Sequence, residues 1–198
     1  WNCQIYADYL KHIDKPTNSE TRYVPSWAKK NAKEIRIGAW YYLQKNEIAK
    51  CKMPLLRYLF LDAIKREYMK DDLETYRWNF HYIINGKEAY VPGLDVSFTA
   101  ENRWVLKEYI RENIEKQILL LLKNGESFEQ IKKREVLLTQ KNAEHEPFEI
   151  VPFVRRNFSE IKEIFAEDQE DIEKLLFAQD KKEAFNAVWY KVLYPTYS

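Results

Sequence analysis

The stretch RWNFHYIINGKEAYVPG, residues 77–93, decides the fold class of this chain. Every second residue from position 78 to position 84 is large and apolar: Trp78, Phe80, Tyr82 and Ile84. This period of two predicts a strand with one buried face. Asn85-Gly86 follows, which is the strongest short signal for a two-residue hairpin turn. A returning strand over residues 87–91, ended by Pro92-Gly93, completes the predicted hairpin.

A hairpin needs further packing, because two strands alone are marginally stable in water. Phe148 to Val151 is the candidate third strand, and Pro152 would keep it at an edge because proline cannot donate to a neighbouring strand. The predicted sheet is therefore small and antiparallel.

Helices are predicted before the hairpin by apolar spacing. One covers the opening segment to Asp14, and a short one begins at Ser26 and carries Trp27 and Ile35. A third covers 38–50. The strongest amphipathic pattern follows Pro54 and runs to Tyr68.

Helices also follow the hairpin. A long one is predicted over 101–123, ended by Asn124-Gly125. Three capping patterns then predict helix starts. Ser127 with Gln130 would open a helix carrying Ile131, Val136, Leu137 and Leu138; Asn157 with Glu160 would open one reaching Leu176; Asp180 with Glu183 would open the last, with Phe185, Val188, Trp189 and Val192.

These elements predict an α+β protein that is mainly α, a helical domain with a small antiparallel sheet built around a hairpin at about 78–91. The 198 residues fit a single domain over 1–198, with a possible sub-boundary near 92–100. Because the chain begins at Trp1, we expect it to be part of a larger protein. Only four glycines occur, which disfavours Gly-rich phosphate loops.

Cysteine content and hydropathy predict an intracellular protein, cytoplasmic or nuclear. Cys3 and Cys51 are far apart and form no disulfide framework. The longest apolar run, Ile118 to Leu122, is far shorter than the roughly 18 residues that a membrane span needs. We therefore expect no membrane partner.

A net charge of +1 conceals two opposed blocks. Residues 22–70 contain 12 Lys and Arg against 4 Asp and Glu, whereas residues 157–180 contain 2 against 8. Local fields rather than net charge steer charged partners. The first block also contains several Trp and Tyr, and nucleic-acid surfaces combine cations for phosphates with aromatic faces for unpaired bases.

The leading hypothesis is therefore a non-enzymatic binding module that docks DNA or RNA on residues 22–70. The residues expected to neutralise phosphate or to stack on bases are Lys29, Lys30, Lys33, Arg36, Lys45, Lys50, Lys52, Trp27 and Trp40. The bland alternative is a solvated cationic face with its aromatics turned inward, as helical spacing indicates for Tyr68.

A second hypothesis is a protein-interaction or assembly domain, in which an acidic helix within 157–180 pairs with the basic block of the same or another chain. A solvated helix face is the plainer interpretation of the acidic residues.

Enzymatic readings have less support. Cys3, His12, Cys51, His81 and His145 lack the paired spacing of zinc ligands, so neither a metal nor a cofactor is expected. Glu88, Asp95 and Glu101 are the carboxylates that a magnesium-dependent nuclease would use, but no matching Glu-x-Lys partner lies nearby.

A loose likeness to a helix-turn-helix covers 118–145, with Gln140, Lys141 and Asn142 chemically able to contact base edges. A plain helical hairpin is the favoured interpretation there, because Glu144 and Glu146 would repel phosphate.

Overall fold

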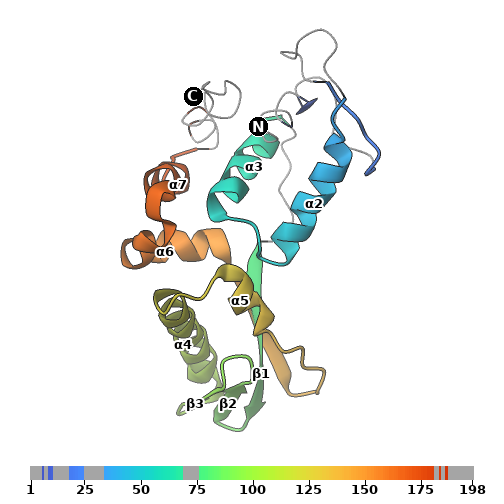
Figure 1. Ribbon diagram of the computed structural model, residues 1–198. Coiled ribbons are helices and arrows are strands. Elements are labelled where there is room, and N and C mark those ends of the chain that lie inside the picture. The colour runs from blue at the N-terminus through green and yellow to red at the C-terminus, as the bar shows by residue number, and fades with distance from the viewer. Residues whose placement is uncertain are drawn as a thin grey trace. The chain divides into compact units, whose positions relative to one another are not determined.

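The computed structural model describes residues 6, 9–10, 18–24, 34–68, 76–180, 183 and 186, with the side chains of 65–68 excluded. The predicted mainly helical α+β class is confirmed (Figure 1). The chain divides into two compact units, Trp1–Thr75 with Glu167–Ser198, and Tyr76–Ala166. The segment 92–100, proposed above as a sub-boundary, lies inside the second unit. That the whole chain forms one domain stays a prediction.

In the second unit, the described residues form a four-stranded antiparallel sheet of order β3-β2-β1-β4. Its strands are β1 (Arg77–Asn85), β2 (Glu88–Val91), β3 (Val96–Thr99) and β4 (Ala143–Glu149). The predicted hairpin is confirmed as β1 and β2, with Ile83 opposite Tyr90. Gly86 takes φ of 61° at the first of the two turn positions, where a type II′ turn requires glycine.

The alternation that predicted β1 defines the core of this unit. Trp78, Phe80, Tyr82 and Ile84 are all buried, Trp78 completely. The Trp78 indole Nε1 donates to the carbonyl of Phe128 at 3.0 Å. Its ring also contacts the rings of Phe128 and Phe153, each edge-on with centroids 5.3 Å apart.

The long helix predicted over 101–123 is confirmed as α4 (Arg103–Lys123), which contacts β2 and β3 (Figure 1). The Asn102 side chain caps it by accepting from the Val105 amide at 3.0 Å. Gly125 ends it with φ of 94°. Its buried side chains recur every four residues: Leu106, Ile110, Ile114, Ile118 and Leu122.

The predicted capping box is confirmed at α5 (Phe128–Lys133), where Ser127 and Gln130 exchange hydrogen bonds. The predicted extent of this helix is wrong. Val136, Leu137 and Leu138 lie beyond its end, and Leu137 is 77% exposed. A helix of six residues buries Ile131 and then gives way to an extended segment leading to β4.

The third strand was predicted only in part, and the start of the helix after it was wrong. Phe148 and Glu149 do lie in β4, which is an edge strand as predicted, but β4 begins at Ala143. β4 ends at Glu149, and Ile150-Val151-Pro152 instead open α6 (Ile150–Ile161). Proline is tolerated there because amides in the first helical turn have no partner within the helix. Asn157 lies inside α6 and donates to the Phe153 carbonyl at 2.9 Å, so it caps nothing.

The predicted helix from Asn157 to Leu176 is interrupted. A 3₁₀ segment, η1 (Lys162–Asp168), follows α6, and Ala166 takes φ of 46° and ψ of −121°. The chain enters the first unit there and continues as α7 (Gln169–Leu176).

The first unit contains α2 (Ile37–Ala49) and α3 (Leu55–Tyr68), which confirm the helices predicted over 38–50 and 55–68. Gly38 is required at the start of α2, because a Cβ there would lie 2.1 Å from the Asn18 carbonyl oxygen. Ile35 was predicted on a short helix but instead forms an antiparallel bridge with Tyr23.

Other predicted features fall largely outside the described residues. They are the helix to Asp14, Trp27 with its capping Ser26, the side chain of Tyr68 and most of the last helix. At the start of that helix the Asp180 carboxylate accepts from the Glu183 amide at 2.7 Å, as its capping pattern predicted.

Candidate nucleic-acid interface

The structure describes five of the nine predicted contact residues, all on or beside α2: Arg36, Trp40, Lys45, Lys50 and Lys52. Trp27, Lys29, Lys30 and Lys33 lie outside the described residues. The candidate interface is therefore assessed on α2 and its two ends.

One side of α2 is buried and the other is open to solvent. Ile37, Tyr41 and Ile48 lie on the buried side. The exposed positions of the helix are Tyr42, Leu43, Asn46 and Ala49, with Lys50 immediately after it. None of these five residues is acidic, so the exposed face presents no charge that repels phosphate.

The acidic residue of α2, Glu47, is neutralised from α3. Its Oε2 lies 2.9 Å from Nη1 of Arg57, and the same nitrogen donates to the buried Gln44 side chain at 3.3 Å. Because Arg57 is held by both groups, it serves the packing of α2 against α3. Glu47 therefore adds little negative field to the exposed face.

Cations gather towards the C-terminal end of α2. The Lys45 ammonium lies 5.8 Å from the ring centroids of both Tyr41 and Tyr42. Lys50 and Lys52 are exposed just beyond the helix. An exposed tyrosine ring near one lysine, on a helix followed by two more exposed lysines, combines a stacking surface with charges for a phosphate backbone.

The stacking residue differs from the one predicted. Trp40 is only half-exposed, and its ring lies 5.6 Å from that of the buried Tyr6. Tyr42 is 39% exposed, although its ring also packs edge-on against that of the buried Tyr41, with centroids 5.3 Å apart. Helical phase carries the missing signal, because Tyr42 lies about 100° further from the buried stripe than Tyr41 does.

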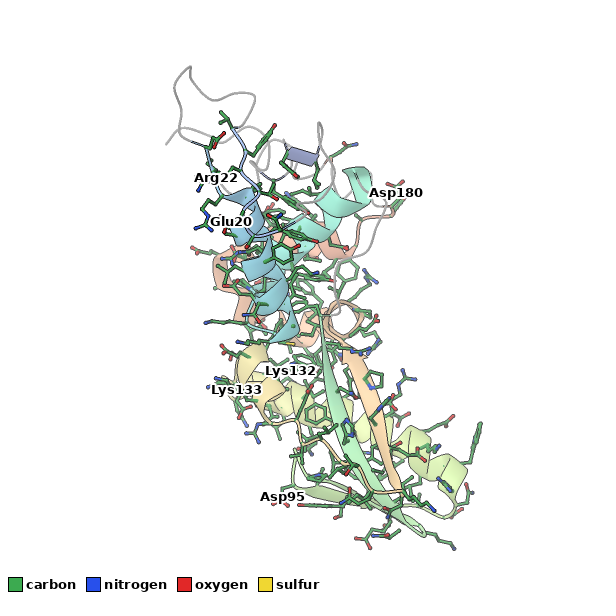
Figure 2. All side chains as sticks on the ribbon, turned by 90° about the vertical axis from the view of Figure 1, so that its right-hand side faces the viewer. Glu20, Arg22, Asp95, Lys132, Lys133 and Asp180 are labelled. Atoms are coloured by element: carbon green, nitrogen blue, oxygen red, sulfur yellow. The ribbon has the colours of Figure 1, made fainter. Side chains whose placement is uncertain are left out.

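Arg36, at the other end of α2, pairs with Glu20 at 2.8 Å. Both side chains are more than half exposed, and Glu20 lies beside the exposed Arg22 on the segment leading to α2 (Figure 2). Exposed ion pairs contribute about 0–1 kcal/mol, so a phosphate competes readily with Glu20 for Arg36.

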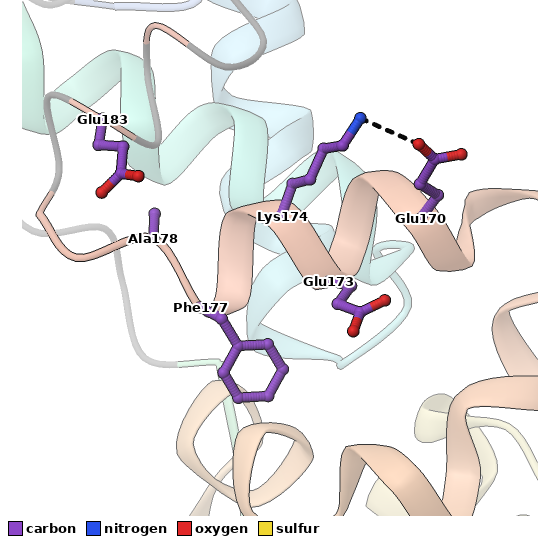
Figure 3. Close-up of a pocket in the computed structure, with 6 residues that line it drawn as sticks. All are labelled: Glu170, Glu173, Lys174, Phe177, Ala178 and Glu183. Carbon is purple, nitrogen blue, oxygen red and sulfur yellow. Dashed lines mark ion pairs between the residues drawn. The ribbon is translucent and has the colours of Figure 1, made fainter.

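The acidic region does not form the single helix that was predicted. Only its α7 part lies in the same unit as α2, where Ile172, Leu175 and Leu176 are buried and α7 contacts α3. A hollow of about 380 Å³ opens beside it (Figure 3). Its lining residues are Glu170, Glu173, Lys174, Phe177, Ala178 and Glu183. With three carboxylates against one lysine, this hollow is unsuited to phosphate.

The structure also places residues of the nuclease hypothesis and of the zinc hypothesis. Asp95 accepts a hydrogen bond from the Tyr90 hydroxyl at 2.9 Å, which raises the pKa of Tyr90. Across the described ranges, no group of three or more His, Cys, Asp or Glu is arranged to hold a metal ion. The His81 and His145 rings face each other across β1 and β4, with centroids 5.6 Å apart.

The helix-turn-helix likeness is not supported by the secondary structure. Gln140 to Asn142 form the turn before β4 rather than a recognition helix. Asn142 donates to the Ile84 carbonyl and to the Asn85 side chain, which ties that turn to the end of β1. On α5, Lys132 reaches the Arg77 carbonyl while Lys133 points outward (Figure 2).

No helix in the part of the chain that the structure describes combines the length and the apolar character that a membrane crossing requires. Comparisons with protein-family models, with curated proteins and with solved structures found no match.

Proposed function

We propose that the chain is a binding module that docks single-stranded nucleic acid on the exposed face of α2. The observation that carries the proposal is the exposed Tyr42 ring near Lys45, on a helix whose exposed positions have no carboxylate and which is followed by the exposed Lys50 and Lys52. Single strands are favoured over duplexes because only unpaired bases can stack on the ring.

Each group has a defined part in this proposal. The three lysines neutralise successive phosphates, and binding releases the counterions that those phosphates had condensed. Tyr42 receives one base, with the Lys45 ammonium 5.8 Å from the centroid of its ring. Arg36 exchanges Glu20 for a phosphate at the opposite end of the helix.

The test is a salt titration of the binding of a fluorescein-labelled oligothymidylate of about 15 nucleotides, starting at about 50 mM salt. For single strands each neutralised phosphate contributes about −0.7 to the slope of log K against log salt. Replacing Lys45, Lys50 and Lys52 together by alanine should therefore flatten that slope by about 2.

The matched control replaces the exposed Lys87, Lys116 and Lys141 of the other unit by alanine, which removes the same charge. This control should leave the slope within about 0.5 of the wild-type value. Equal slopes for both triple variants would mean that binding follows net charge alone. Absence of any binding at about 50 mM salt would also contradict the proposal.

A further inference from the structure

A second exposed helix face, in the other unit, has the opposite character. The first half of α4 presents three exposed apolar side chains, Trp104 at 77%, Val105 at 45% and Tyr109 at 42%. Exposed glutamates at 101, 108 and 112 alternate with them. At about 100° per residue, Glu108 and Glu112 fall on the same side of the helix as Trp104 and Val105, and Glu101 lies just before the Asn102 cap.

The cations in the first half of α4 pair with two carboxylates of β4. Arg103 and Lys107 both pair with Glu144 at 2.9 Å, and Arg111 pairs with Glu146 at 3.0 Å. These are all the cations in the first half of the helix. Their side chains are 46–70% exposed, but each is paired with a carboxylate of β4 rather than with Glu108 or Glu112.

Glu144 is the shared partner of two of these cations. Hydrogen bonds from Lys107, together with those from Arg103 and Tyr82, lower the pKa of Glu144 against the opposing effect of burial. Burial raises the pKa of Tyr82, and the neighbouring Glu144 carboxylate raises it further. Glu144 is therefore ionised at neutral pH and remains the partner of Arg103 and Lys107.

The face is also preorganised. Leu106 and Ile110 are completely buried beneath it, and the Asn102 cap fixes the first turn. The Tyr109 ring packs edge-on against Phe98 of β3, with centroids 5.8 Å apart. A partner that docks there would lose little free energy in ordering the helix.

We propose that this face, made of Glu101, Trp104, Val105, Glu108, Tyr109 and Glu112, docks a basic peptide segment of a partner protein. Charge complementarity selects the occupant, because glutamates one turn apart repel each other until a cation lies between them. Trp104 provides the ring that binds an arginine or lysine most strongly. Apolar residues of the peptide would cover Val105 and Tyr109.

This inference is independent of the proposed nucleic-acid site, since it concerns the other unit and a ligand of opposite charge. The probe is a fluorescein-labelled peptide of about four Arg-Leu-Lys repeats, titrated into the full chain. A peptide of Glu-Leu-Glu repeats serves as the charge-reversed probe. The readouts are fluorescence anisotropy and the NMR signal of the Trp104 indole N–H, assigned with Trp104→Phe.

The basic peptide should bind and shift the Trp104 indole signal, whereas the acidic peptide should do neither. Trp104→Ala should weaken binding by about tenfold or more. The triple variant Glu101→Gln, Glu108→Gln, Glu112→Gln should weaken it by about tenfold. Neither variant buries or exposes core, so both should unfold within about 0.5 kcal/mol of the wild type.

The matched control replaces the exposed Glu88, Glu149 and Glu163 of the same unit by glutamine. It should bind the peptide within about twofold of the wild type. An equal loss in the control, or an unmoved Trp104 signal, would overturn the proposal. A wild-type dimer that Trp104→Ala dissociates would also overturn it, because the occupant would then be a second copy of the chain.

Discussion

Helices α2 and α4 each bury one stripe and expose an aromatic ring, but the unpaired charges near the two rings differ in sign. On α2 the acidic residue Glu47 is neutralised by Arg57 of α3, which leaves Lys45 near an exposed Tyr42. On α4 the cations are held by Glu144 and Glu146 of β4, which leaves glutamates beside an exposed Trp104. The charge available on a helix face therefore depends on which of its charged side chains are paired with a neighbouring element. The net charge of +1 does not show these local differences.

The largest effect is expected in the aromatic core that β1 forms with α5 and α6. Trp78→Ala deletes a fully buried ring and its hydrogen bond to Phe128, so it should lower the free energy of unfolding by about 3–5 kcal/mol. Urea denaturation measures this change. Trp104→Ala, which removes a ring that is 77% exposed, is the control and should cost less than about 0.5 kcal/mol.

The next largest effect is expected at the exposed aromatic residue of α2. Tyr42→Ala should weaken oligothymidylate binding by about 1–3 kcal/mol, because one stacked base is lost. Tyr90→Ala is a close control, since both rings are 39% exposed and Tyr90 lies on β2 of the other unit. If both variants weaken binding equally in anisotropy titrations, Tyr42 has no special role.

The pairing of the α4 cations with β4 can be tested by a substitution of Glu144. Glu144→Gln should lower the free energy of unfolding by about 1 kcal/mol at pH 7, because Arg103 and Lys107 lose their shared partner. The folded-state pKa of Glu144 lies below its ordinary value, so this contribution is complete above about pH 5. It is lost as the pH falls through the lowered pKa.

Urea denaturation of both proteins at several pH values checks this dependence. The difference between wild type and Glu144→Gln should shrink steadily below about pH 4. A difference that stays constant down to pH 2 would show that the charge of Glu144 is not what stabilises the unit.

The smallest effect is expected at the ion pair between Arg36 and Glu20. Glu20→Gln removes its ion-pair partner and a carboxylate near the proposed site, so oligothymidylate affinity should rise by about two- to threefold. Glu129→Gln makes the same charge change at the exposed Lys133 pair in the other unit. Anisotropy titrations in which both variants gain equally would assign the effect to net charge.

Local signals predicted much of the fold correctly. The alternation from Trp78 to Ile84, the turn glycine Gly86 and the capping box at Ser127 each act over a few residues. The four-residue repeat from Leu106 to Leu122 is equally local. Such features are determined by the chain segment itself, so they are visible in the sequence.

The failures came from tertiary contacts. The inner face of β4 contains Glu144 and Glu146, which contradicts an apolar alternation, and α4 cations satisfy both. β3 was missed because Val96 and Phe98 alone are too short a pattern. The helical phase of α2 would have favoured Tyr42, but the packing of Trp40 against Tyr6 is a tertiary contact that no local pattern shows.

We propose two exposed helix faces that bind two different ligands, α2 a single-stranded nucleic acid and α4 a basic peptide. The most direct measurement is a ¹H–¹⁵N NMR titration of the full chain, first with oligothymidylate and then with the Arg-Leu-Lys peptide. The account predicts that the oligonucleotide shifts amides of α2 around Tyr42, and that the peptide shifts amides of α4 around Trp104. It would be contradicted if both ligands shifted the same set of amides, or if neither set moved.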